Sequence, residues 1–178
     1  ERQKSISHNS IAFGLDADLV FSAHAAGKKY LDVNEWAYTN ILEGEEFFRP
    51  TSSHEPLTEE GNRVVFKSDI ETEDDENNTF DCIITKGAPQ RNWIVVPNNH
   101  ALVVFHHWYA RNRYRRFANF FASRGITVIE ATLPHHFNRG KDDHSEEKFL
   151  SASLGRTLRS VRQAALDGRK IVRWLDSK

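Results

Sequence analysis

The chain of 178 residues lacks several features that would define a functional class at once. Its one cysteine, Cys82, excludes an internal disulfide and fits a reducing compartment. No apolar run approaches the roughly 20 residues of a membrane helix, and no signal-peptide pattern is present. The net charge of −1 gives no general reason to expect nucleic acid or an anionic membrane as a partner. We therefore expect a cytoplasmic protein without a membrane span or a nucleic-acid partner.

Methionine is also absent, and the chain starts at Glu1, as expected of a partial or trimmed polypeptide. What is present divides into two parts. Residues 1–60 have mixed apolar and polar faces broken by glycines, which predicts a helical N-terminal extension that packs on the main domain or covers a substrate. Residues 61–178 alternate strand and helix patterns, which predicts an α/β core.

The core begins with three short apolar segments separated by turns. Arg63 to Ile70, Phe80 to Thr85 and Trp93 to Val96 read as strands, and their tight spacing suggests an antiparallel start to the sheet. The segment from Asp69 to Asp81, both included, contains seven acidic residues and no basic ones. We interpret this run as a solvated hairpin tip or loop, because it lacks the ligand spacing of a calcium loop.

A strand–helix–strand unit follows. Leu102 to Phe105 is continuously apolar, like a parallel strand buried on both faces. Arg113 to Arg124 has apolar residues at helical spacing, and Gly125 is a suitable residue to end that helix. Ile126 to Ile129 is the second strand. In open parallel sheets, ligands bind beyond the carboxyl ends of the strands, and a histidine pair follows each of these two strands.

Phe149 to Lys178 reads as a long helix with an entry turn. Its apolar residues recur at spacings of three, four or seven and define the face that we expect to be buried: Leu154, Leu158, Val161, Ala165, Val172 and Leu175. Five arginines occupy mostly the other face, which we interpret as solvated: Arg156, Arg159, Arg162, Arg169 and Arg173.

The order of these elements resembles the first half of an α/β-hydrolase. In that superfamily the third strand commonly ends in a His-Gly turn, and His106-His107-Trp108 stands in that place. The Gly that opens the fourth strand is matched by Gly125, the loop after that strand by Leu133 to Gly140, and a Trp-Leu pair in the next helix by Trp174-Leu175. The match covers about residues 80–178 and is most similar to bacterial members with a helical N-terminal extension.

This resemblance implies an incomplete α/β-hydrolase core, with an antiparallel start followed by parallel strands flanked by helices. The family's G-x-S-x-G nucleophile turn follows the helix with the Trp-Leu pair, so the nucleophile, acid and histidine are expected after Lys178. The closest match here is the segment 151–155, where Ser153 fits a helix-start residue better than a nucleophile. By itself the chain should be inactive.

The resemblance also assigns candidate site residues for a small-molecule ester or acyl substrate, with no cofactor. The oxyanion and substrate loop would contain His106, His107, Trp108 and Tyr109. The wall of the substrate site would contain His135, His136 and Arg139. For His106 we favour a structural role, bonding nearby backbone, over a substrate contact. Arg139 could bind a substrate carboxylate or phosphate, but we favour that it ties its loop to Asp142 and Asp143.

Two other functions stay open. A metal-dependent hydrolase would draw ligands from the histidine pairs together with Asp142, Asp143 and His144, although adjacent histidines on an extended chain point to opposite sides. A binding or scaffold module needs no nucleophile. We also expect the strand 102–105 to lie at an unpaired sheet edge, through which copies of the chain could associate.

Overall fold

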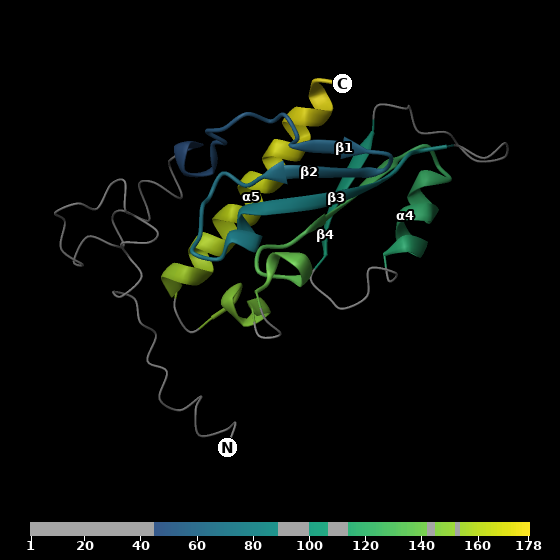
Figure 1. The fold of residues 1–178 in the computed structure, drawn as a ribbon. Coiled ribbons are helices and arrows are strands. Elements are labelled where there is room, and N and C mark those ends of the chain that lie inside the picture. Colours follow the sequence, from purple (N-terminus) through teal and green to yellow (C-terminus); the bar gives the residue numbers. More distant parts are fainter. Residues whose placement is uncertain (1–44, 89–99, 107–113, 142–144, 152–153) are drawn as a thin grey trace, which may run out of the picture.

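The computed structural model describes residues 45–88, 100–106, 114–141, 145–151 and 154–178. These residues form a five-stranded mixed sheet and two α-helices, an α/β arrangement in the order β1-β2-β3-β5-β4 (Figure 1). Four short 3₁₀ helices accompany them: η3 (Glu45–Phe48), η4 (Asp75–Asn78), η5 (Phe137–Arg139) and η6 (Ser145–Lys148). The expected N-terminal helices and the strand over residues 93–96 lie outside the described residues.

The sheet starts antiparallel, as expected. β1 (Thr58–Glu60), β2 (Arg63–Lys67) and β3 (Thr79–Thr85) pair in antiparallel order. β5 (Thr127–Thr132) is antiparallel to β3 and parallel to β4 (Ala101–His106). The strand β1 was not predicted, and it begins before the expected domain boundary at residues 60 and 61.

The helix between the two parallel strands ends as its sequence indicates. α4 covers Arg115–Ala122. Gly125 has a φ of 88° and donates its N–H to Ala122 O, while Ile126 donates to Phe121 O, which together form a Schellman motif. This motif turns the chain directly into β5.

The main core lies between the sheet and the long helix α5 (Leu154–Asp176), which crosses one face of the sheet (Figure 1). Phe66 stacks on Phe80 at 5.3 Å between ring centroids, and Trp174 meets Phe66 edge-on at 5.6 Å. The fully or almost fully buried members of this core are Val64, Phe66, Phe80, Cys82, Ile129, Ala131, Ile171 and Trp174. Burial also raises the pKa of the Cys82 thiol, which makes that thiol inert.

The buried face of α5 is not the one that we expected. Val161 and Val172, assigned to the core, are 42% and 49% exposed. The face that packs on the sheet carries four buried polar residues together with Leu166, Ile171 and Trp174: Ser160, Gln163, Asp167 and Lys170. Periodicity located the helix, but it could not show that paired polar groups fill its inner face.

The arginines of α5 are not simply a solvated face either. Arg162, Arg169 and Arg173 donate hydrogen bonds to backbone carbonyls of residues 47, 48 and 50, at 2.7, 2.6 and 3.3 Å. Just beyond, Lys170 forms a buried ion pair with Asp69 and donates to the hydroxyl of Ser52. These side chains fasten the segment 45–52 along the helix.

Two glycines of this fold should respond in opposite ways to alanine. A Cβ on Gly87 would lie 2.4 Å from Gly125 O, so the two backbones would have to separate. A Cβ on Gly168 would meet only Phe105, at 3.4 Å, and would relieve the backbone entropy cost of glycine inside α5. We expect Gly87→Ala to lower the free energy of unfolding by about 1–3 kcal/mol. Gly168→Ala should raise it by about 0.5–1 kcal/mol, and urea unfolding would measure both.

Candidate functional site

The loop after β5 lies at the carboxyl end of the parallel strands and has a constrained backbone. His135 and Phe137 have φ angles of 63° and 51°, which are uncommon for residues other than glycine. The loop closes tightly, because a Cβ on Gly140 would come within 2.8 Å of Ser145 Cβ. Such backbone strain persists only where surrounding contacts impose it, and it is often found at functional sites.

Arg139 holds this loop in place. It is 0% exposed, and its guanidinium forms an ion pair with Asp167 of α5 at 2.9 Å. The same guanidinium donates to the carbonyls of Thr132 at 2.9 Å and Asn77 at 3.0 Å. One side chain thus joins the end of β5, the end of η4 and the middle of α5.

A chain of hydrogen bonds extends from this ion pair. Ser68 donates to Asp167 at 2.7 Å, and Gln163 donates to Ser68 at 3.1 Å and to the Asn77 carbonyl at 3.0 Å. Burial raises the pKa of Asp167, which Arg139 and Ser68 oppose, and burial lowers the pKa of Arg139. The pair therefore depends on these hydrogen bonds to offset the cost of burying two charges, and Arg139 Nε has no partner among the described residues.

His135 is buried beside this network. Its backbone N–H donates to Asn77 Oδ1 at 2.9 Å, and its Nε2 lies 3.4 Å from the amide nitrogen of Asn77. That amide nitrogen also donates to Gln163 Oε1 at 3.0 Å and to Thr72 Oγ1 at 3.3 Å. Burial lowers the pKa of His135 to about 4, and the ring is therefore neutral near pH 7.

The Nδ1 atom of His135 has no hydrogen-bond partner among the described residues. The residue His135 also lines a small cavity with a volume of about 10 Å³. That volume holds about one water molecule. The cavity is lined by Thr72, Glu73, His135, Lys148, Arg156, Arg159 and Ser160.

His136 is also buried but makes ordinary local contacts. Its Nδ1 lies 2.8 Å from Pro134 O, and its ring meets Phe149 edge-on at 5.5 Å between centroids. Its side chain forms no ion pair with the described residues. We therefore interpret His136 as a packing residue that positions the loop.

A second polar group lies at the same edge of the sheet. Asp81 on β3 is 4% exposed and accepts hydrogen bonds from Thr132 at 3.0 Å and Asn138 at 3.1 Å, with Arg63 at 3.3 Å. His106 ends β4 in register with Thr132, so strand pairing brings these two candidate regions together.

The structure describes some of the predicted site residues and leaves others outside the described part of the chain. His106 and the loop containing His135, His136 and Arg139 do meet at one edge of the sheet. Arg139 has no exposed surface, and its guanidinium is tied to Asp167 of α5. His107, Trp108 and Tyr109 lie outside the described residues, as do residues 142–144 and Ser153.

The residues that sequence reasoning missed come mainly from the acidic run. Asp74, Asn77 and Asp81 are buried, at 6%, 0% and 4% exposure, within a segment that we expected to be solvated. Only the two asparagines that end the run hinted at local hydrogen bonding. In the described part of the chain, no group of three His, Cys, Asp or Glu side chains is placed to hold a metal ion.

The Arg139–Asp167 pair should be essential for stability. Asp167→Asn would leave the Arg139 charge buried without its counter-ion, so we expect a loss of about 3–5 kcal/mol in the free energy of unfolding. Glu71→Gln breaks the exposed Lys67–Glu71 pair and is a matched control that should change stability little. Urea unfolding would measure both variants, and equal effects would contradict the structural role of the buried pair.

His135 should make stability depend on pH. Its folded pKa of about 4 lies below the ordinary 6.5, so the unfolded chain takes up a proton first as the pH falls. Stability should therefore decrease between pH 6.5 and 4, by up to about 3 kcal/mol from this residue.

His135→Asn, which tolerates the positive φ, should reduce this pH dependence, whereas His54→Asn at a half-buried position in the segment before β1 should not. Urea unfolding at several pH values would test this. If His135→Asn and the unaltered protein lost stability in parallel, the neutral buried state of His135 would be wrong.

Comparisons with known proteins do not assign the chain to a family. No protein-family model matches the chain, and no curated protein matches it. Within the described residues, no helix combines the length and apolar composition needed to cross a bilayer. Function must therefore be inferred from the geometry itself.

Proposed function

We propose that residues 61–178 are the N-terminal portion of a serine hydrolase of the α/β-hydrolase type, acting on a carboxylic ester or related acyl substrate. In this proposal the chain supplies the oxyanion loop and part of the substrate-site wall. The nucleophile, acid and catalytic histidine belong to sequence that follows Lys178. The observation that carries the proposal is an apolar face of α5 that lies open next to β4.

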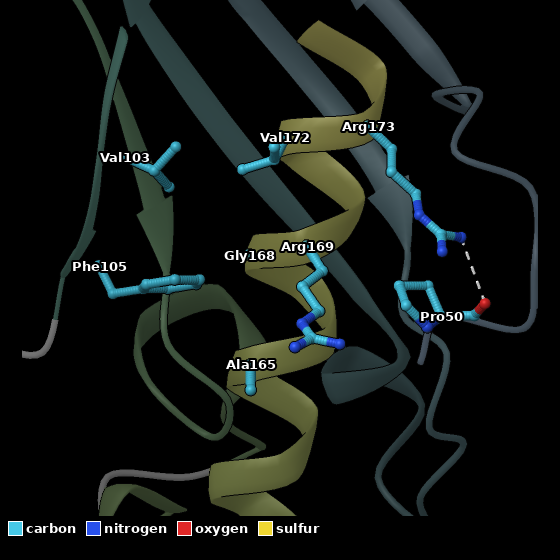
Figure 2. A pocket seen from close by; sticks show the side chains of 8 residues that line it. All are labelled: Pro50, Val103, Phe105, Ala165, Gly168, Arg169, Val172 and Arg173. Atoms are coloured by element: carbon cyan, nitrogen blue, oxygen red, sulfur yellow. Dashed lines mark hydrogen bonds between the residues drawn. The ribbon is translucent and has the colours of Figure 1, made fainter. Parts of the chain in front are cut away.

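This face borders a groove of about 480 Å³ between β4 and α5 (Figure 2). Figure 2 shows Val103 and Phe105 of β4 on one side and Val172, Gly168 and Ala165 of α5 on the other. The groove is lined by Pro50, Val103, Phe105, Ala165, Gly168, Arg169, Val172 and Arg173. An apolar surface of this kind usually marks a place where another element packs.

The strand order supports the same conclusion. Within the described residues β4 is the last strand of the sheet and pairs only with β5. In the resemblance to α/β-hydrolases, β4 takes the place of the family's third strand. The family's fifth strand would then pair with the free edge of β4. That strand would extend the sheet, and the helix after it would cover Val161 and Val172.

The edge of the sheet supplies the chemical part of the proposal. The loops after β4 and β5 meet at the carboxyl ends of parallel strands, where catalytic groups of open α/β sheets are found. An oxyanion donor in the loop after β4 would be a backbone N–H, with Trp108 as the candidate by position. The constrained loop after β5 would form the adjacent wall.

A second candidate is a binding or scaffold module that uses the same open edge. Unpaired apolar strand edges promote association, so copies of the chain would pair through β4. This alternative needs neither a nucleophile nor a substrate. Size-exclusion chromatography at several protein concentrations distinguishes it, because edge pairing makes the apparent mass depend on concentration.

The experiment for the hydrolase proposal compares two polypeptides. The present chain should hydrolyse p-nitrophenyl acetate no faster than buffer. The chain extended by the codons that follow Lys178 in its gene should contain a strand and a G-x-S-x-G turn and should hydrolyse the ester. Its Ser→Ala variant at that turn is the matched control, and we expect a loss of roughly three orders of magnitude or more.

Turnover by the present chain that disappeared in Ser153→Ala would contradict the proposal, because it would place the nucleophile inside residues 1–178. A stop codon directly after Lys178 would also contradict it and would favour the binding module. These outcomes are independent of whether the fragment is stable on its own.

A further inference from the structure

We propose that α4 docks this chain on an anionic lipid surface, with exposed phenylalanines entering the acyl boundary and arginines meeting the lipid phosphates. The proposal rests on the outward side of α4 and on the charge of the sequence around this helix. It does not depend on the hydrolase proposal, because docking requires neither a nucleophile nor sequence after Lys178.

The large apolar residues of α4 are on its exposed side. The helix packs against β5 and β3, and its buried residues are the small Ala118 and Ala122. Phe117 and Phe120, by contrast, are 39% and 51% exposed. A helix of a globular domain usually places its large apolar side chains against the core, so α4 has the opposite distribution. An exposed apolar surface of this kind marks a place of interaction.

The sequence around α4 is strongly basic. Residues 82–129 contain seven lysines and arginines and no aspartate or glutamate. The net charge of −1 for the whole chain therefore conceals a basic segment that acidic residues elsewhere balance. Within this segment, Arg115 and Arg116 are exposed at the start of α4 and form no ion pair with the described residues. Basic side chains of this kind are attracted to the negative potential of anionic lipids.

Basic and aromatic side chains alternate along the outward side of this helix. Arg116 and Phe120 are four residues apart and so share one side of α4, next to Phe117. Just after the helix, the Arg124 guanidinium lies 3.6 Å from the centroid of the Phe120 ring. The phenylalanines thus have an arginine at each end. This order suits a bilayer boundary, where rings enter the acyl region and guanidiniums reach out to the phosphates.

The packing of the rings distinguishes a lipid surface from a single-stranded nucleic acid. Bases stack on aromatic rings whose faces stand open. Here the centroid of Phe121 is 4.7 Å from that of Phe117 and 5.2 Å from that of Phe120, and Arg124 covers one face of Phe120. The three rings form one apolar cluster rather than separate stacking platforms, and such a cluster fits acyl chains.

The position of α4 keeps this surface apart from the groove beside β4. Ile129 and Ala131 of β5 belong to the core that α5 covers, so Val128, which alternates with them, lies on the other face of the sheet. α4 contributes no residue to that core and lies away from α5, with the sheet between them (Figure 1). Docking through α4 therefore leaves the groove free for the element that the hydrolase proposal places there.

The test is flotation of the present chain with vesicles of phosphatidylcholine alone and of phosphatidylcholine with about one third phosphatidylserine. We expect the chain to float with the anionic vesicles and to stay behind with the neutral ones. The bound fraction should fall at high salt, because salt screens the arginines. A fluorescent oligouridylate, measured by anisotropy in the same buffer, represents a nucleic acid and should not bind.

Arg115→Gln combined with Arg116→Gln should weaken vesicle binding by about fivefold for each arginine removed. Phe120→Ser should weaken it by about tenfold, because the exposed ring no longer enters the bilayer. Two matched controls should bind like the unaltered protein: Arg169→Gln, which removes an exposed arginine from α5, and Leu150→Ser, which removes an exposed apolar side chain before α5. The amide spectrum of each variant shows whether the fold is retained.

A failure to bind anionic vesicles, equal binding to both vesicles, or equal losses in the α4 variants and the controls would overturn the proposal. Binding of the oligouridylate would do the same, since it would show a nucleic-acid site or attraction to anions in general. An apparent mass that rises with protein concentration only when α4 is unaltered, without vesicle binding, would assign this surface to a second copy. The ester-hydrolysis result bears on none of these outcomes, so the two proposals can fail separately.

Discussion

The buried ion pair between Arg139 and Asp167 is the interaction on which the rest of this structure depends. Both side chains are fully buried, and burial disfavours the charged state of each, so neither would be tolerated alone. Together they connect the end of β5, the end of η4 and the middle of α5. The loop that carries His135 keeps its two positive φ angles because this connection is rigid.

The same helix buries polar residues beside the apolar Leu166, Ile171 and Trp174, unlike a simple amphipathic helix. Its inner face contains Gln163, Asp167 and Lys170, each with specific partners, while Val161 and Val172 are exposed. Specific polar contacts fix the position of α5 along the sheet more tightly than an apolar stripe would. The apolar residues are thereby left for the groove beside β4, where another layer would pack.

The sequence predicted what depends on local patterns. It located β2, β3, β4, β5 and both helices, the antiparallel start of the sheet, and Gly125 as the residue that ends α4. It did not predict the inner face of α5, because hydropathy counts Asp167 and Lys170 as surface residues. The burial of Asp74 and Asn77 was missed for the same reason: their partners, Lys148 and Gln163, lie more than 70 residues away. Periodicity carries no information on such distant pairs.

The candidate site shows how this difficulty affects the assignment of function. An arginine in a loop at the carboxyl edge is a reasonable ligand for an anion, but it can serve that purpose only if its guanidinium reaches the surface. Arg139 gives its hydrogen bonds to Asp167, Thr132 and Asn77, and its side chain has no exposed surface. Arg159 of α5, in contrast, is partly exposed and contacts the segment before β3 through the Glu71 carbonyl and the Glu73 carboxylate. Because a structural arginine and a ligand-binding arginine look identical in sequence, only burial and the contacts of the guanidinium separate them, and here they assign an anchoring role to Arg139.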